Sequence, residues 1–391
     1  MNIDIKQEVT ELKEELIAVR RDFHMHPELA FEEHRTAEIL ATRLQKLGFE
    51  VQTGVAKTGV VGVLDLGKPG KTLMLRADID ALPIQEIEGR SYGSTYPGKM
   101  HACGHDGHTA VSLVIADILA KHKDQLKGKV KIVFQPAEEI VAGGKLMLEE
   151  GVMENPKPDR VIGFHTFPSL PRGQIGVRNG AMWAGVEELC IKVKGTGGHG
   201  GTPHVTADPI VAGSNIDLSL ENIIARELSQ FNPAALTMGV FSGGTRFNVI
   251  PDAIEIRGSS RTFSDDTREF VRRRVEEISQ HIAEAYRCSA TVSVERSAPA
   301  VWNNAEVANA VREAASLVVG SNNVVDPGQS TVGDDVSVFL NEAPGCYFLL
   351  GVGNAEKGAG APLHSPEYDL DEEALPIALE TMSRAAIEFL S

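Results

Sequence analysis

One cysteine and three histidines lie within eight residues of this 391-residue chain, in the segment His101–His108. Thiolate and imidazole are the side chains that divalent transition metals prefer in proteins. Gly104 and Gly107 permit a tight, irregular backbone, so that Cys103 and His105 could converge on one point. The segment therefore predicts a metal site just before a helix. The alternative is a helix-capping loop whose histidines occur there by chance.

Two adjacent acids, Glu138 and Glu139, directly follow an apolar strand that we expect over residues 129–135. Ligands and catalytic bases commonly lie at the carboxyl ends of parallel strands. Of two carboxylates placed there, one can bind a cation while the other accepts a proton from a metal-bound water. The pair therefore predicts hydrolytic chemistry. The simpler alternative is a solvated acidic start of a helix, which the helix dipole would favour.

Four further side chains lie where they could join such a site. Asp78 and Asp80 follow another predicted strand, and they could bind a metal or orient a histidine that does. His165 ends a third apolar strand, and His364 lies in a proline-flanked loop. Taken alone, Asp78 and Asp80 favour a turn, and His165 or His364 alone favours a structural role.

Apolar strands alternate with helices towards both ends of the chain, which is typical of an α/β layer architecture. The middle of the chain differs, because its order of strand, helix, two strands, helix and strand is that of a split βαβ unit. We therefore expect a discontinuous domain, residues 1–184 and 298–391, interrupted by an inserted domain, residues 185–297. The predicted helices cover residues 5–22, 31–47, 109–122, 208–229, 265–285, 304–319, 335–341 and 371–390, and the predicted strands cover 59–66, 72–77, 129–135, 160–164, 186–196, 235–242, 253–263, 289–296 and 345–351.

The composition is that of an ordinary globular protein, with 42% apolar and 24% charged residues. The 38 Lys and Arg against 54 Asp and Glu give a net charge of −16, which would repel phosphate backbones and anionic lipid surfaces. The first residues lack the apolar segment of a signal peptide, and no apolar run is long enough for a transmembrane helix. Four widely spaced cysteines favour a reducing compartment. We therefore expect a cytoplasmic protein that binds neither nucleic acid nor membrane.

Several motifs, in order along nearly the whole chain, resemble those of the dinuclear metallopeptidases, in the branch of aminoacylases, hippurate hydrolases and auxin-conjugate amidohydrolases. The resemblance implies a mixed-sheet α/β catalytic domain with helices on both faces. It also implies that the insert is an α+β ferredoxin-like (βαββαβ) domain that serves as a lid and in dimerisation. The motifs are His24–Glu28, His101–His108, Gln135–Glu139, Gly197–His204 and His364–Pro366.

The resemblance implies a metal-dependent amidohydrolase that cleaves the amide bond of an N-acyl-L-amino acid, of the deacetylase, aminoacylase or hippurate hydrolase type. It implies two divalent metal ions per subunit. Mn²⁺, Zn²⁺, Co²⁺ and Ni²⁺ all stay open, because mixed sulfur, nitrogen and oxygen donors do not single out one metal. We expect a homodimer, with a tetramer as the alternative. The implied metal ligands are Cys103, His105, Glu139, His165 and His364.

The resemblance also implies roles for residues around the metals. Glu138 falls where the family has its general base. His199, in the inserted domain, matches a histidine that polarises the scissile carbonyl, often across a dimer interface. Asn248 and Arg261 match positions that hold substrate, and the planar guanidinium of Arg261 suits a carboxylate.

Two departures from the family pattern bear on substrate preference. Ile140-Val141-Ala142 separates the acid pair from Gly143 and Gly144, whereas relatives usually have a glycine-rich stretch at once. Asp334-Asp335-Val336 stands in place of an expected Glu-Asp-Phe. The implied ligands and base are all present, so these departures bear less on the chemistry.

Two other functions stay open. Cys103 could be the nucleophile of a metal-independent hydrolase with a nearby histidine as its base. The chain could also be a non-catalytic metal-binding member of the fold, although a pure binding site needs no second acid such as Glu138. Activity that survives EDTA, together with an acyl-Cys103 adduct, would favour the first of these functions.

Overall fold

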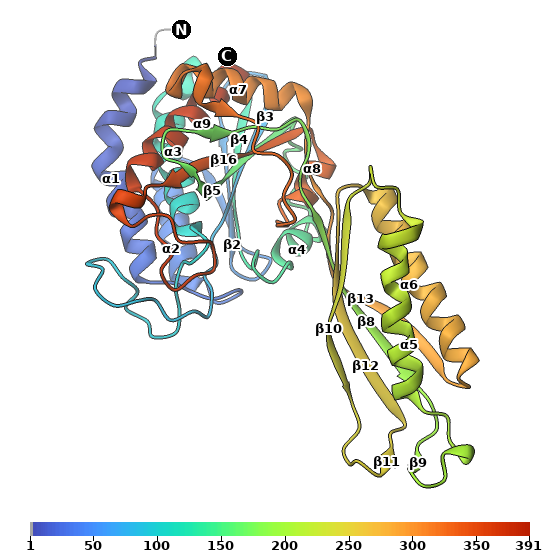
Figure 1. Ribbon diagram of the computed structural model, residues 1–391. Helices are drawn as coiled ribbons and strands as arrows, with labels where there is room; N and C mark the ends of the chain where they lie inside the picture. Colours follow the sequence, from blue (N-terminus) through green and yellow to red (C-terminus); the bar gives the residue numbers. More distant parts are fainter. Residues whose placement is uncertain (1–2) are drawn as a thin grey trace. The chain divides into compact units, whose positions relative to one another are not determined.

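The computed structural model describes residues 3–391, which fall into two compact units (Figure 1). We call them the large unit and the small unit. Three stretches of chain make up the large unit, so it is discontinuous in sequence. The large unit comprises the chain up to Met182, Trp302–Gly328 and Asp335–Ser391, and the small unit comprises Trp183–Val301 and Gln329–Asp334.

The large unit is built on an eight-stranded sheet in the order β1-β2-β4-β3-β5-β16-β6-β15. β4, β3, β5 and β16 are parallel neighbours, whereas β2 runs antiparallel to both β1 and β4. This confirms the expected mixed α/β sheet. The sequence does not predict the edge strand β1, because most of its side chains are exposed and it has no apolar run. The strands are β1 Glu50–Val55, β2 Gly59–Asp65, β3 Thr72–Asp78, β4 Lys129–Gln135, β5 Arg160–Pro171, β6 Ile175–Gly176, β15 Val324–Val325 and β16 Gly345–Gly353.

Helices and sheet together form one apolar core in the large unit. α3 is buried along almost its whole length, as its apolar sequence requires. It begins at His105 and not at the predicted Thr109, because packing overrides the poor helix propensity of Gly107. Among residues 3–391, no helix combines the length and apolar character needed to cross a membrane. The helices are α1 Ile5–Met25, α2 His34–Lys46, α3 His105–Lys121, α4 Gly143–Glu149, α7 Ala305–Val319, α8 Ser337–Glu342 and α9 Leu375–Phe389.

The small unit holds a four-stranded antiparallel sheet in the order β10-β12-β8-β13, on which α5 and α6 pack side by side (Figure 1). Alternate residues of β8, namely Leu189, Ile191 and Val193, contribute to its core, as the two-residue period of a strand requires. A separate two-stranded pair, β9 and β11, joins two loops. The elements are β8 Gly185–Lys194, β9 Gly198–His199, α5 Pro209–Asn222, β10 Ala234–Gly243, β11 Val249–Ile250, β12 Ala253–Thr262, α6 Asp265–Ala285 and β13 Ser289–Ala298. The chain passes between the units within β7 Gly180–Trp183 and β14 Val301–Asn303, and again at both ends of Gln329–Asp334.

Candidate metal centre

Three neighbouring parallel strands of the large unit bring five of the predicted site residues, Asp78, Asp80, Glu138, Glu139 and His165, to one edge of the sheet. Strand pairing sets Asp78, at the end of β3, opposite Gln135, at the end of β4. The pairing of β3 with β5 sets Arg76 opposite Gly163, two residues before His165. The segments that follow β3 and β4 therefore leave the sheet near the part of β5 that carries His165, as expected for the carboxyl ends of parallel strands.

Six side chains from these strands and the segments after them, from α3 and the loop before it, and from the loop before α9 form one linked cluster, which we call the ligand cluster. Each member offers a sulfur, nitrogen or oxygen atom, and within each of three overlapping groups these atoms lie within 4.8 Å of one another. The cluster brings together all five predicted ligands and the predicted base. The groups are Cys103, His105 and His165; Cys103, Glu139 and His364; and His105, Glu138 and Glu139.

The separations inside the ligand cluster match those between donors that bind the same cation. Cys103 Sγ lies 3.5 Å from His165 Nε2, and His364 Nε2 lies 3.4 Å from Glu139 Oε2. His105 Nε2 lies 3.9 Å from Glu139 Oε1. Two donors that each lie about 2.1 Å from the same ion are themselves about 3–4 Å apart. These distances therefore fit donors that share a metal ion.

Two buried atoms of the ligand cluster, His105 Nε2 and Glu139 Oε1, have no hydrogen-bond partner among residues 3–391. His105 Nδ1 lies 2.9 Å from the carbonyl oxygen of Asp80, so in the neutral ring Nε2 carries the free lone pair. Burial lowers the pKa of His105, but Asp78, Asp80 and Glu139 outweigh burial and raise it to about 10. The surroundings of the ring thus carry an excess of negative charge, which a divalent cation would offset while satisfying both unpartnered atoms. The residues present therefore fit a metal site.

Asp80 connects two members of the ligand cluster. Its carbonyl accepts the His105 Nδ1–H, and its Oδ2 accepts the backbone N–H of Glu139 at 3.0 Å. Asp80 is buried, so these contacts are not shared with solvent. This is the arrangement by which residues behind metal ligands fix the orientation of the ligands.

His108 lies beside the ligand cluster but has no lone pair left for a metal. Its Nδ1 lies 2.6 Å from Asp78 Oδ1, and its Nε2 accepts the backbone N–H of Thr166 at 2.9 Å. Arg76 donates to the other oxygen of Asp78 at 2.7 Å. His108 and Arg76 therefore hold Asp78 from two sides.

Arg76 and Asp335 form a buried ion pair that the sequence reasoning missed. Arg76 Nη2 lies 3.3 Å from Asp335 Oδ1, and Arg76 Nε donates to Gln135 Oε1 at 2.9 Å. Asp335 also accepts the backbone N–H of Gly144 at 2.8 Å. The middle residue of the Asp334-Asp335-Val336 departure thus anchors the loop after β4. An arginine inside an otherwise apolar strand was the available signal.

The loop that carries the acid pair depends on unusual backbone geometry. Ala137 has φ +54°, in the left-handed region that non-glycine residues rarely adopt. A Cβ on Gly143 would lie 1.6 Å from the Pro136 carbonyl oxygen, so only glycine fits there. Val141 N–H donates to the Glu138 carbonyl at 2.7 Å. The extra residues before Gly143 are therefore accommodated as a tight turn next to the acid pair.

Gly104 is required where the chain passes between Cys103 and His105. Its φ is +89°, and a Cβ there would lie 2.2 Å from Thr166 Oγ1 and 2.5 Å from the Tyr368 hydroxyl. We expect Gly104→Ala to lower the free energy of unfolding by about 2–4 kcal/mol, because strain and steric overlap add. Gly98→Ala is the control, since Gly98 has φ +76° with no atom within 4 Å, and it should cost only about 1 kcal/mol. Urea denaturation measures both values, and equal losses would contradict the packing argument.

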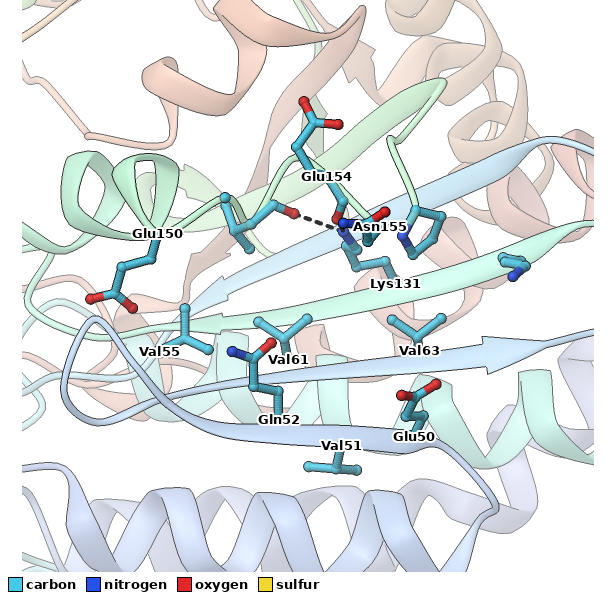
Figure 2. Close-up of a pocket in the computed structure, with 14 residues that line it drawn as sticks. Glu50, Val51, Gln52, Val55, Val61, Val63, Lys131, Glu150, Glu154 and Asn155 are labelled. Carbon is cyan, nitrogen blue, oxygen red and sulfur yellow. Dashed lines mark hydrogen bonds between the residues drawn. The ribbon is translucent and has the colours of Figure 1, made fainter.

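A cavity of about 610 Å³ lies elsewhere in the large unit, between β1, β2, β4 and residues 150–156 (Figure 2). None of the six ligand-cluster residues lines it. The buried Lys131 donates to the backbone carbonyls of Val152 and Glu154 at 2.7 Å each. Lys131 therefore fastens residues 150–156 over the sheet, and the cavity is separate from the ligand cluster.

The three candidate residues of the small unit lie in two places. β9 and β11 pair His199 with Val249, and Gly200 N–H donates to the Asn248 carbonyl at 2.9 Å, so His199 and Asn248 are neighbours. Arg261 lies near the other end of β12, paired with Val186 of β8. The small unit therefore brings His199 and Asn248 together but not Arg261.

A mixed α/β fold with clustered thiol, imidazole and carboxylate donors is an arrangement that metal-dependent hydrolases use. The chain belongs to the Peptidase family M20/M25/M40, whose model matches residues 74–388. This confirms the resemblance drawn from the motifs, and with it a hydrolase that acts on linear amides and uses divalent metal ions.

Similar proteins cover nearly the whole chain. The N-acetyl-L-cysteine deacetylase of Bacillus subtilis is 36% identical over 93% of this chain and 85% of its own length. The IAA-amino acid hydrolase ILR1-like 4 of Arabidopsis thaliana is 35% identical over 96% of this chain and 86% of its own. The crystal structure of the Bacillus subtilis YXEP protein, described as a dinuclear metal binding peptidase from the M20 family, has a TM-score of 0.83 at 34% identity and covers 97% of this chain and 99% of that one.

Proposed function

We propose that this protein hydrolyses the amide bond of N-acyl-L-amino acids with two divalent metal ions. The single observation that carries the proposal is the ligand cluster, in which sulfur, nitrogen and oxygen donors converge. Two of its buried atoms, His105 Nε2 and Glu139 Oε1, have no hydrogen-bond partner among residues 3–391, and the carboxylates around His105 carry an excess of negative charge. The similarity to an N-acetyl-L-cysteine deacetylase and to an IAA-amino acid hydrolase supports this substrate class. The proposed ligands are Cys103, His105, Glu139, His165 and His364.

Glu138 is the proposed general base. Divalent metal ions bound in such a site acidify water and polarise a carbonyl group. Glu138 would accept the proton of the attacking water and pass it to the amine nitrogen as the amide bond breaks. Its side chain is largely buried, and its Oε2 lies 4.0 Å from His105 Nε2, within the ligand cluster. A buried carboxylate beside the reacting groups suits both proton transfers.

His199 is proposed to stabilise the oxyanion that develops on the scissile carbonyl. Its Nδ1 accepts the backbone N–H of Gly201 at 2.9 Å, so the neutral ring carries its proton on Nε2. Nε2 is then a donor, and the exposed position of the side chain leaves it available to substrate. Loss of one such donor typically costs about 3–4 kcal/mol of transition-state stabilisation.

Arg261 and Asn248 are proposed to hold the substrate, with the Arg261 guanidinium binding its carboxylate. Burial lowers the pKa of Arg261, and no nearby carboxylate opposes this effect. A half-buried guanidinium that has no hydrogen-bond or ion-pair partner among residues 3–391 suits a bidentate contact with a substrate carboxylate. We propose that the small unit acts as the lid and that the protein forms a dimer.

A metal-independent role for Cys103 as nucleophile is less favoured. The 3.5 Å separation of Cys103 Sγ from His165 Nε2 would suit a Cys-His pair. However, burial, with Glu139 and Glu138 nearby, raises the pKa of the Cys103 thiol well above its usual value. Without a cation the reactive thiolate would therefore be scarce.

Chelation separates these possibilities. EDTA treatment followed by gel filtration is expected to lower the rate of N-acyl-L-amino acid hydrolysis by about 10²-fold or more, since the metal ions supply the main activation of water. Adding back Mn²⁺, Co²⁺, Ni²⁺ or Zn²⁺ separately should restore it and identify the most active metal. A panel of N-acetyl, N-benzoyl and indole-acetyl amino acids identifies the acyl group. Full activity without metal, with an acylated Cys103 peptide in the mass spectrum, would overturn the proposal.

A further inference from the structure

Glu33 is a buried carboxylic acid outside the ligand cluster that contacts the backbone of the acid-pair loop. Its side chain is fully buried just before α2. Its Oε1 accepts the backbone N–H of Ala137 at 3.0 Å, and its Oε2 accepts the Thr58 hydroxyl at 2.5 Å. Among residues 3–391, no Lys, Arg or His forms an ion pair with it. Burying a carboxyl group without a counter-ion lowers the stability of the fold. The presence of Glu33 at this position therefore needs an explanation.

Ala137, the residue whose N–H Glu33 accepts, has a strained backbone conformation. Ala137 has φ +54° and directly precedes Glu138. A non-glycine residue in this region costs about 1–3 kcal/mol and persists only where its surroundings fix it. The Ala137 carbonyl accepts the N–H of Gly143 at 3.1 Å, and Glu33 satisfies the Ala137 N–H. Both backbone polar groups of Ala137, its N–H and its carbonyl, are therefore held by hydrogen bonds.

The backbone is held on both sides of Glu138 by a buried carboxylate. Glu33 accepts the N–H of Ala137, and Asp80 accepts the N–H of Glu139 at 3.0 Å. These two contacts set the direction in which the side chains of Glu138 and Glu139 leave the chain. Since an error of about 1 Å in a catalytic group can cost about 10²-fold in rate, this control bears on catalysis.

We propose that Glu33 is a positioning residue of the hydrolytic site, acting on Glu138 and Glu139 through the Ala137 N–H. This inference rests on the proposed function, in which these two acids are the base and a metal ligand. The contact needs an acceptor oxygen and not a charge. Burial, opposed by the Thr58 hydrogen bond and reinforced by Asp80, raises the pKa of Glu33 to about 7, so a neutral amide is a fair substitute there.

Three substitutions separate positioning from a merely structural role. Glu33→Gln keeps an oxygen for Ala137 and an N–H for Thr58. Glu33→Leu removes the acceptor, and Glu33→Asp keeps a carboxylate but withdraws it by one methylene. The matched control is Glu28→Leu, because the Glu28 carboxylate accepts the N–H groups of Arg35 and Thr36 at 2.9 and 2.8 Å without touching the acid-pair loop.

With N-acyl-L-amino acid as substrate and metal content checked by mass spectrometry, Glu33→Leu and Glu33→Asp are expected to lower kcat by about 10- to 100-fold, with KM within about threefold. Glu33→Gln should stay within about threefold of the unchanged protein. Glu28→Leu should lower the melting temperature but not the kcat of the folded protein. The proposal is overturned if Glu33→Leu and Glu33→Asp keep kcat, or if Glu33→Gln fails to restore it.

A second readout needs no substrate. Hydrogen exchange of the peptide containing the Ala137 amide should be at least about tenfold faster in Glu33→Leu and Glu33→Asp than in Glu33→Gln or Glu28→Leu. Unchanged exchange would overturn the positioning role. If the protein hydrolyses no N-acyl-L-amino acid but the Ala137 amide responds as expected, the proposed function fails while the contact by which Glu33 acts stands.

Discussion

Glu138→Gln is expected to keep the full metal content of the protein while lowering kcat by about 10³-fold or more. Glutamine preserves the size and hydrogen-bonding oxygen of the side chain but cannot accept a proton. General acid–base catalysis typically contributes about 10²- to 10⁴-fold, and here one group is proposed to serve in both proton transfers. Inductively coupled plasma mass spectrometry of the purified variant gives the metal content, and steady-state kinetics give kcat.

Glu149→Gln is the control for this experiment. Glu149 is an exposed residue of α4, so replacing its carboxylate by an amide should change neither kcat nor metal content. If Glu138→Gln retains near-normal turnover, Glu138 is not the general base. If it loses its metal ions, Glu138 acts as a ligand, and the division of roles within the acid pair is wrong.

Cys103→Ala is expected to lower metal occupancy below two ions per chain and kcat/KM by roughly 10²-fold or more. Loss of residues behind the ligands already costs about 10- to 100-fold in metalloenzymes, and loss of a ligand should cost at least as much. Cys103 belongs to two of the three donor groups in the ligand cluster, so its removal affects more than one pair of donors. Metal titration followed by calorimetry measures the affinity directly.

Cys346→Ala provides the matched control, because Cys346 is a free, fully buried thiol of β16 outside the ligand cluster. Both variants remove a thiol from the interior of the large unit, and both leave a small cavity. Only Cys103→Ala should change metal affinity. Equal effects on metal content would show that packing, and not ligation, explains the loss.

The convergence of the ligand cluster could be predicted from sequence because it follows from general rules. Glu138 and Glu139 follow β4, Asp78 ends β3 and Asp80 follows it. The carboxyl ends of neighbouring parallel strands share an edge of the sheet. His364 is distant in sequence from the other candidate ligands, and no local pattern connects it with them. Only the order of the motifs, through the family resemblance, indicates that it is a ligand. Short-range physics and the family resemblance therefore predicted the candidate ligands together.

The supporting contacts could not be predicted in the same way. Glu33 contacts Ala137, which is 104 residues away in the sequence. Glu32 and Glu33 are adjacent acids, and nothing in the sequence shows that Glu33 is the one that will be buried. The sequence predicts a start of α3 at Thr109, four residues late, because Gly107 disfavours a helix, whereas tertiary packing extends the helix to His105. Contacts of this kind depend on the packed structure and not on local pattern.

The position of β16 in the large sheet has a consequence for synthesis. β16 lies between β5 and β6, yet it belongs to the last part of the chain, and His364 follows it. A nascent chain that has reached only residue 340 has an open edge on β5 and lacks one candidate ligand. The elements of the small unit are by then complete and can fold as the chain emerges. The complete set of candidate ligands is therefore present only after His364 has been synthesised.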